Sequence, residues 1–308
     1  MSPNKRTGRK RDYVGVLSSV FAIVIGLLVG FVILLICNPS QALPGFVTIL
    51  TGAFTHGLKG VGQVFYYATP IILTGLSVGF AFKTGLFNIG TPGQFIVGAF
   101  AAVYVGIMWT GLGRIQWAVA LLAAILGGAL WGMVPGVLKA CFNVNEVIAS
   151  IMMNYIGMYM VNWIVKSYKP LFNNLRNESR NVAATAQIPK MGMDKLFPES
   201  SVGGGILLAV AAVLLIWVIL NKTTFGYELK AVGFNRDAGR YAGINEKRNI
   251  IMSMVIAGAI AGMAGGLLYL AGTGKHIEIK DVLAAEGFTG ISVALLGLSH
   301  PIGVLFSG

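Results

Sequence analysis

Charged residues are scarce in this sequence of 308 residues, where Asp, Glu, Lys and Arg together make up only 11%. Soluble globular domains carry about 25% charged residues, so the shortage argues against an ordinary soluble protein. Hydrophobic residues make up 56% of the chain, and there are 42 glycines, which let membrane helices approach one another closely. The composition therefore predicts an integral membrane protein.

Side chains that carry out chemistry are also few. The three histidines are scattered, no phosphate-binding G-x-x-x-x-G-K-[ST] loop occurs, and no Ser-His-Asp arrangement can be argued. The apolar runs lack the Asp, Glu and His series of a proton relay. Cys37 and Cys141 close runs expected to end at opposite membrane faces, which argues against a disulfide. We therefore expect no enzyme activity, metal or cofactor in this chain. The net charge of +12 comes without a basic patch interleaved with aromatic residues, so we expect no nucleic-acid partner.

Apolar runs long enough to cross a hydrocarbon core of about 30 Å recur along the chain. The expected fold class is an all-α polytopic membrane protein with about 8–10 transmembrane helices. A tail over 1–13 precedes a single transmembrane domain over 14–308, with expected spans at 14–37, 61–82, 95–109, 115–141, 146–166, 206–220, 250–271 and 282–298. The closing residues IGVLFSG reach only about 12 Å as a helix, so we expect a truncated C-terminus, with a half-helix as the alternative.

Basic residues determine the expected orientation. Five of them lie in the tail 1–13, and Lys and Arg remain concentrated in alternate connections once the long polar segment 167–205 is set aside. The positive-inside rule then places the N-terminus in the cytoplasm. Segment 167–205 becomes an extracellular loop, and segment 221–249 becomes cytoplasmic.

Segment 221–249 is polar and lies between two long apolar runs. We name it the platform. Gly233 and Gly243 are expected to divide it into short helices over 227–232 and 236–242. Its nine charged residues keep it out of lipid, and its aliphatic residues make it too compact for an idle linker. We interpret the platform as a docking surface on one membrane face.

Segment 83–94 reads KTGLFNIGTPGQ, and its glycines and proline prevent a continuous helix. Asn88, Thr91 and Gln94 supply uncharged hydrogen-bonding groups. Broken backbone at membrane depth persists only where protein buries it or water reaches it, and transporters commonly bind polar substrates at such breaks. A broken or re-entrant segment that contributes to a substrate path is one interpretation, and a plain turn between spans is the other.

Four further residues are candidates for the substrate path. Asn145 and Glu146 suit a helix N-terminus, where a capping role is the favoured interpretation. Asn154 falls mid-span and either lines a path or makes an interhelical hydrogen bond. Glu286 either lines a pore or lies at the outer interface, the second being favoured. Glycines at four-residue spacing, 258/262/266 and 128/132/136, predict flat helix faces for close packing.

Four strings in order carry a family resemblance: GLFNIGTPGQFIVGAFAA (85–102), NVNEVIASIMMNYI (143–156), LKAVGFNRDAGRYAGINEKRNIIMSMVIAGAIAGMAGG (229–266) and EGFTGISVALLGLSHPIG (286–303). They resemble the permease subunits of bacterial ABC importers of the ribose and branched-chain amino-acid type. The FNIG-x-x-GQ and NEVI-x-x-x-M-x-NYI strings are most similar to the simple-sugar and nucleoside permeases. Such permeases usually continue for one or two more spans.

The resemblance implies a multi-pass protein of the bacterial inner membrane that imports nucleosides. It implies three protein partners: a cytoplasmic ATPase that uses the ATP, a second permease subunit that is identical or homologous, and an extracytoplasmic substrate-binding lipoprotein. Residues 226–248 would contact the ATPase, through Glu228, Ala231, Gly233, Asn235, Arg236, Asp237, Arg240 and Gly243. The alternatives are a simple-sugar permease, an ion-coupled secondary transporter, and a scaffold subunit that transports nothing.

Overall fold

The computed structural model of the chain describes residues 6–308. They divide into two compact units, unit 1 up to Val61 and unit 2 from Gly62 to Gly308. Of the tail expected over 1–13, residues 1–5 lie outside the described residues, and helix begins at Arg6.

Unit 1 contains a long apolar helix and a shorter one. Helix α1 (Arg6–Cys37) includes a stretch, Val20–Cys37, that is apolar enough to cross a membrane. Helix α2 (Pro39–Thr55) follows directly, because a proline fits the first turn of a helix, where its missing N–H is not needed. The rings of Phe31 and Phe46 lie 4.8 Å apart, so the two helices pack against each other.

Unit 2 is a helical body with short strands in one connection. Its helices are α3 (Gly57–Lys83, which starts in unit 1), α4 (Thr91–Met108), η1 (Thr110–Ile115), α5 (Gln116–Phe142), α6 (Glu146–Ser167), η2 (Ala184–Ala186), α7 (Met193–Leu196), α8 (Gly205–Lys222), α9 (Thr224–Phe234), α10 (Arg236–Tyr241), α11 (Glu246–Tyr269), α12 (Ala285–Leu296) and α13 (Pro301–Ser307). Strands β1 (Phe172–Asn173) and β2 (Glu178–Ser179) pair in antiparallel fashion.

Within the described residues, seven helices are long and apolar enough to cross a membrane, or eight if the bent pair α12–α13 forms one span. Large apolar side chains of α5, α6 and α8 are exposed, among them Leu126, Trp163 and Leu215. Such outward apolar faces suit lipid or another membrane subunit. The all-α polytopic fold expected from the sequence is confirmed.

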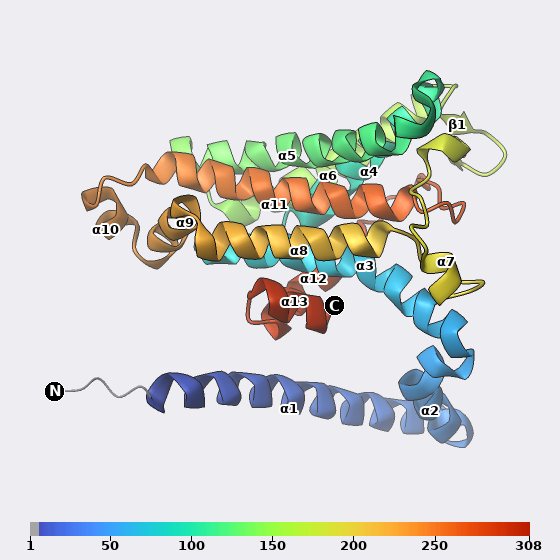
Figure 1. The fold of residues 1–308 in the computed structure, drawn as a ribbon, viewed down its shortest axis with the longest axis horizontal. Coiled ribbons are helices and arrows are strands. Elements are labelled where there is room, and N and C mark those ends of the chain that lie inside the picture. The colour runs from blue at the N-terminus through green and yellow to red at the C-terminus, as the bar shows by residue number, and fades with distance from the viewer. Residues whose placement is uncertain (1–5) are drawn as a thin grey trace. The chain divides into compact units, whose positions relative to one another are not determined.

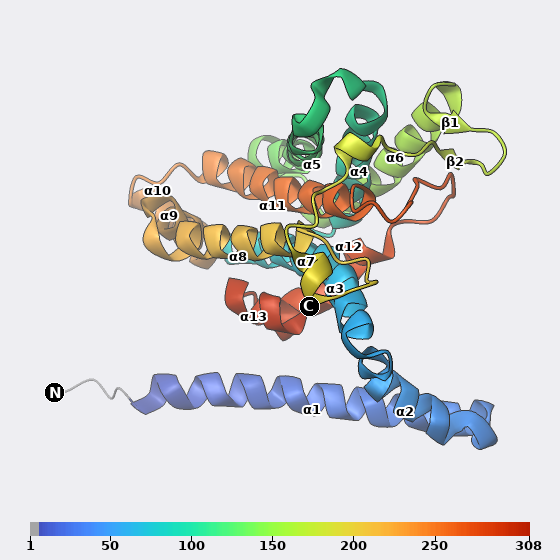
Figure 2. The same ribbon diagram turned by 45° about the vertical axis from the view of Figure 1, so that its right-hand side comes forward.

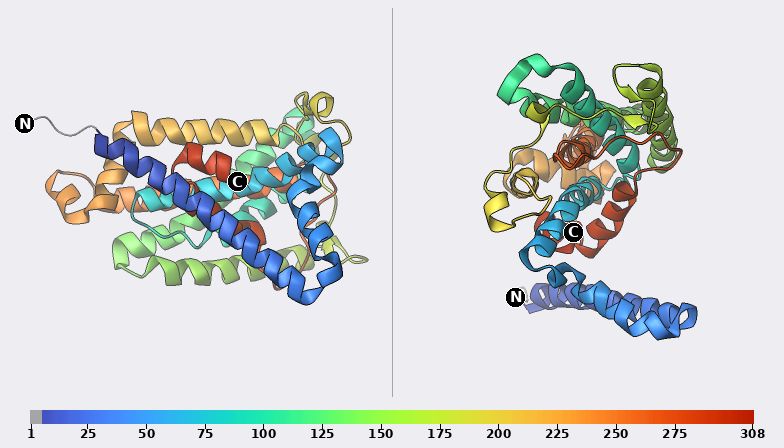
Figure 3. Two further views of the ribbon diagram at one scale, coloured as in Figure 1. Left: turned by 90° about the horizontal axis from the view of Figure 1, so that it is seen from below. Right: turned by 90° about the vertical axis from the view of Figure 1, so that its right-hand side faces the viewer.

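Glycines hold the centre of unit 2 together. Helix α11 runs through the interior, as the end-on view in the right panel of Figure 3 shows. A Cβ at Gly128 of α5 would lie 2.2 Å from the carbonyl oxygen of Gly258 in α11, and one at Gly262 would lie 2.3 Å from that of Ala124. No side chain fits there, so the two helices touch backbone to backbone. The close-packing faces expected from the glycine spacing are confirmed.

The connections gather at two opposite ends of unit 2 (Figure 1). Helices α9 and α10 lie at one end, which we name the platform end. Strands β1 and β2 and helix α7 lie at the other, which we name the loop end. There Ser179 N–H donates to the Ile277 carbonyl and Ile188 N–H to the Leu270 carbonyl, which ties segment 167–205 to the residues after α11.

The structure differs from the expected elements near the C-terminus. In place of one helix over 282–298 it has α12, of 12 residues, and α13, bent from it by 118° (Figure 2). Leu298 and Ser299 both adopt positive φ, 53°, at the bend. Twelve residues of helix reach only about 18 Å, less than the thickness of a hydrocarbon core. The chain therefore turns back within the body or crosses it as a broken span.

Candidate functional site

The platform consists of two capped helices. Thr223 accepts a hydrogen bond from Gly226 N–H at the start of α9, and Asn235 accepts one from Ala238 N–H at the start of α10. The break lies at Asn235, whose backbone is extended, and not at Gly233, which is inside α9. The expected break at Gly243 has the positive φ, 79°, that favours glycine.

One side of the platform is anchored to the helical body. Val232 is buried in a cluster with Leu86 and with Ile250 of α11. Asn249 donates from Nδ2 to Glu228 Oε2 at 3.1 Å, which joins α9 to α11. Because these contacts combine apolar burial with a hydrogen bond, α9 and the start of α11 have to move together.

The other side of the platform is open. Phe234 and Tyr241 are 96% and 95% exposed, and Tyr227 is 69% exposed. Asp237, Arg240 and Tyr241 line an open hollow of about 550 Å³. Arg236 lies 4.0 Å from Glu246, at the margin of an ion pair. Exposed aromatic side chains beside charges are typical of the centre of a protein interface.

The turn over 84–90 connects the platform to the interior. A Cβ at Gly233 would lie 2.4 Å from the Lys83 carbonyl oxygen, and one at Gly85 would lie 3.1 Å from the Gly233 carbonyl oxygen. The hydroxyls of Thr84 and Ser253 hydrogen-bond to each other, which joins the turn to α11. The platform thus rests directly on the backbone of this turn.

The three polar residues expected in segment 83–94 are buried and paired with one another. Asn88 Nδ2 donates to Gln94 Oε1 at 3.0 Å, and Gln94 Nε2 donates back to Asn88 Oδ1 at 3.2 Å. Thr91 Oγ1 donates to the Asn88 carbonyl at 3.2 Å. The two side-chain amides satisfy each other, and the Thr91 hydroxyl satisfies a carbonyl of the irregular backbone, as an interior break requires. They give the residues a role in the fold, and contact with substrate stays a prediction.

Asn154 caps α4 from another helix. Its Oδ1 accepts from Gly93 N–H at 2.8 Å, and its Nδ2 donates to the Ile89 carbonyl at 3.0 Å. The first turn of a helix has free N–H groups, and here an amide 61 residues away satisfies one of them. Asn154 is eight residues into α6, so α4 begins about 12 Å inside the platform end.

Asn145 and Glu146 lie at the platform end. Asn145 Oδ1 accepts from Val147 N–H at 2.9 Å and caps α6, and Glu146 lies 2.9 Å from Lys139 Nζ on α5. These contacts match the favoured capping interpretation. Both residues are on the far side of the buried turn from Glu286.

Glu286 lies in the first turn of α12, beside the start of α4. Its carbonyl accepts from Thr74 Oγ1 at 2.9 Å, and a Cβ at the next residue, Gly287, would lie 2.6 Å from Pro92 Cα. Thr74 is nine residues before Lys83, so this contact is about 14 Å inside the platform end of α3. The structure therefore places the Glu286 backbone at the depth where α4 begins, while its side chain is 28% exposed.

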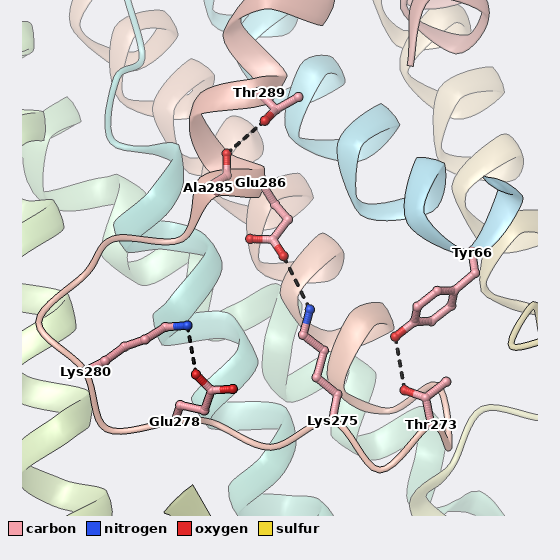
Figure 4. Close-up of polar contacts among 8 residues, drawn as sticks. All are labelled: Tyr66, Thr273, Lys275, Glu278, Lys280, Ala285, Glu286 and Thr289. Atoms are coloured by element: carbon pink, nitrogen blue, oxygen red, sulfur yellow. Dashed lines mark hydrogen bonds and ion pairs between the residues drawn. The ribbon is translucent and has the colours of Figure 1, made fainter. Parts of the chain in front are cut away.

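The Glu286 carboxylate faces Lys275, whose Nζ donates to Oε1 at 3.4 Å (Figure 4). Beside this pair, Lys280 Nζ donates to Glu278 Oε2 at 2.9 Å, and the ammonium holds the pKa of the Glu278 carboxyl below its usual range. The sequence interpretation overlooked both lysines, because their partners lie on other elements or in an irregular loop. Within residues 6–308, no three His, Cys, Asp or Glu side chains form a group that could hold a metal.

The structure thus brings Asn88, Thr91, Gln94 and Asn154 together around the start of α4. Glu286 lies next to this group through the contact of Gly287 with Pro92. The platform touches the beginning of the same turn, at Lys83, Thr84 and Gly85, through Gly233. The turn over 84–90 therefore lies between the platform and Glu286.

Comparison with known proteins gives a consistent result. Residues 60–308 match the family of branched-chain amino acid transport system / permease components. The chain is 41% identical, over 94% of its length and 81% of the relative's, to the guanosine ABC transporter permease protein NupP of Bacillus subtilis. It is 36% identical, over 95% of its length and 80% of the relative's, to the nucleoside ABC transporter permease protein NupB of Lactococcus lactis.

A third relative is named for a different solute. The glucose ABC transporter permease protein TsgB13 of Haloferax volcanii is 31% identical over 85% of this chain and 69% of its own. No solved structure matches the chain significantly.

Proposed function

This chain belongs to the family of branched-chain amino acid transport system / permease components, and on that basis we propose that it is the membrane subunit of an ATP-driven importer of nucleosides. The proposed solute class rests on two relatives that match nearly the whole chain, because one is named a guanosine permease and the other a nucleoside permease. The glucose permease is less similar and matches less of both chains, so the simple-sugar alternative has weaker support.

The platform is the part of the chain suited to receive the ATPase. Its exposed Phe234 and Tyr241 provide apolar area, and Asp237 and Arg240 provide charges beside it. A partner that buries this side would contact the exposed coupling residues Asn235, Asp237 and Arg240, whereas Gly233 faces the turn of the body. Glu228 faces the body instead, through Asn249. ATP hydrolysis then belongs to the partner.

A push on the platform reaches the interior through backbone contacts. Gly233 presses on Lys83 and on the turn over 84–90, and the turn leads into α4. Pro92 at the start of α4 touches Gly287 of α12. Since each contact has almost no free space, a displacement of α9 shifts α4 and α12 instead of being absorbed. We propose that displacement along this series of contacts opens and closes a route for the solute.

The orientation follows from the same proposal. The platform end faces the cytoplasm, where ATP is available, and the loop end faces the outside, where a binding protein delivers solute. We place the N-terminus in the cytoplasm as well, on the basic residues of the tail 1–13. The exposed apolar residues of α5, α6 and α8 provide a face for a second permease subunit and for lipid.

Uptake of labelled guanosine and ribose by cells with the complete transporter, with and without this chain, tests the function. We expect guanosine uptake to fall to background without the chain and to return when it is restored. If ribose uptake depends on the presence of the chain and guanosine uptake does not, the simple-sugar alternative is established. If neither guanosine uptake nor ribose uptake falls when the chain is absent, the proposal is contradicted.

A second arm distinguishes the energy source. The same cells receive an ATPase partner with its catalytic residues inactivated, and guanosine uptake is measured with the membrane potential intact. We expect uptake to stop. Uptake that continues would identify an ion-coupled secondary transporter. A purified complex of this chain that contains neither an ATPase nor a binding protein would favour a scaffold.

A further inference from the structure

A cavity of about 240 Å³ opens beside Glu286. Helices α4, α6, α11 and α12 and the connection between α11 and α12 line it. Drug-sized ligands occupy pockets of roughly 300–1,000 Å³, so this cavity suits a solute the size of a single nucleoside or sugar and excludes an oligomer.

Apolar side chains form one part of the wall. Ile96 comes from α4, Met158 from α6 and Tyr269 from α11. Met158 is 3% exposed, so this part lies deep. Lys275 Nζ is 6.0 Å above the ring of Tyr269, within range of a cation–π contact. A flat heteroaromatic ring fits such a surface, because its faces are apolar and its size matches that of the aromatic side chain.

Two pairs of charged residues form another part of the wall. Lys275 faces Glu286 at 3.4 Å, and Lys280 faces Glu278 at 2.9 Å. Each lysine is neutralised by its own carboxylate, so the four groups add no net charge. An ionic solute would have to break a pair in order to bind, whereas an uncharged solute with hydroxyl groups can donate to the carboxylates and accept from the ammonium groups. The wall therefore favours a neutral polyol over an amino acid or a phosphate.

The cavity extends from the loop end to the buried turn. Asn162 Nδ2 donates to the Lys280 carbonyl at 3.0 Å and holds the loop segment against α6. At the inner side, Ile96 lies two residues beyond Gln94 in α4, and Glu286 adjoins the contact between Gly287 and Pro92. A solute bound here touches the elements that a movement of the platform displaces.

We propose that this cavity is a nucleoside-binding site of the permease, with the base against Ile96, Met158 and Tyr269 and the ribose hydroxyls at the Lys275–Glu286 pair. This inference rests on the proposed function and adds the location and chemistry of the site. Such a site would bind a nucleoside more tightly than either of its parts, because the free base lacks the hydroxyls and free ribose lacks the ring.

Protection of a cysteine from a hydrophilic methanethiosulfonate reagent tests the site in membranes that contain the complete transporter. Cys37 and Cys141 are first replaced by Ser. Val282 lines the cavity and is 65% exposed, and Leu196 of α7 is 59% exposed at the same end but is not among the lining residues. We expect guanosine to slow the labelling of V282C at least fivefold and that of L196C not at all. Guanine and ribose, each alone, should protect V282C much less.

The variant E286Q is tested in the V282C background, with S150A as a matched control elsewhere in the interior. We expect E286Q to raise the guanosine concentration for half-protection about tenfold and S150A to leave it unchanged. Equal labelling with and without guanosine, in a transporter whose guanosine uptake depends on this chain, would overturn the site but not the function. Protection by ribose as strong as by guanosine would overturn the nucleoside assignment.

Discussion

Gly85 and Gly233 lie against each other across the boundary between the platform and the helical body. A Cβ at Gly233 would meet the Lys83 carbonyl oxygen at 2.4 Å, and one at Gly85 would meet the Gly233 carbonyl oxygen at 3.1 Å. Backbone in direct contact with backbone has no flexible side chain to yield between the two parts. The pair therefore forms a stiff link from the platform to the turn over 84–90.

The first prediction concerns this link. The variant G233A forces α9 away from Lys83, so guanosine uptake should fall at least tenfold while ATP hydrolysis by the complex continues. The control G239A lies in α10, where the added methyl would make only ordinary contact with Val232 at 3.6 Å. Uptake by G239A should stay within a factor of two. Normal transport by an inserted G233A protein would mean that the contact does not transmit movement.

The second prediction concerns the interhelical cap. The variant N154A removes both hydrogen bonds to the start of α4 and leaves buried groups unpaired, at a cost of about 1–3 kcal/mol for each group. We expect a lower Tm for the purified protein in detergent. Ser150, one turn away on α6, is also buried, and its hydroxyl has no hydrogen-bond partner within the described residues. S150A should therefore leave the Tm unchanged or raise it, and an equal loss in both variants would refute the capping role.

The third prediction concerns the contact of α5 with α11. The variant G258A places a methyl 2.3 Å from the Gly128 carbonyl oxygen, so the helices have to separate. Overpacking of this kind costs about 1–3 kcal/mol, which should appear as a lower Tm and a smaller yield of inserted protein. The control G30A adds a methyl to α1 where nothing lies within 4 Å, and it should be neutral or slightly stabilising.

The fourth prediction concerns the exposed aromatic residues of the platform. In pull-down experiments with the ATPase subunit, F234A and Y241A should each weaken binding at least tenfold, since buried aromatic anchors contribute about 2 kcal/mol or more to interfaces. Leu175, 95% exposed at the loop end, provides the control L175A, which should bind normally. Weaker binding by L175A alone would place the ATPase at the loop end and reverse the orientation.

Much of this architecture follows from local properties of the sequence. Runs of apolar residues determine which segments can leave water, because the transfer free energy is a sum over the segment. Asn145 begins a helix through its own neighbours, and four-residue spacing places Gly258 and Gly262 on one face. The two short helices of the platform are likewise local, although the break falls at Asn235 because its side chain caps the second helix.

Other features depend on residues that only the folded chain brings together. Asn154 caps a helix that begins 63 positions earlier in the sequence, at Thr91, and Gly233 has no room for a side chain because the Lys83 carbonyl lies against it. The bend of 118° between α12 and α13 and the pairing of Glu286 with Lys275 are of the same kind. Each depends on distances between elements, and those distances are set by how closely neighbouring helices can pack. The sequence by itself thus determined which segments are membrane helices, while the tertiary structure decided which polar groups meet between them.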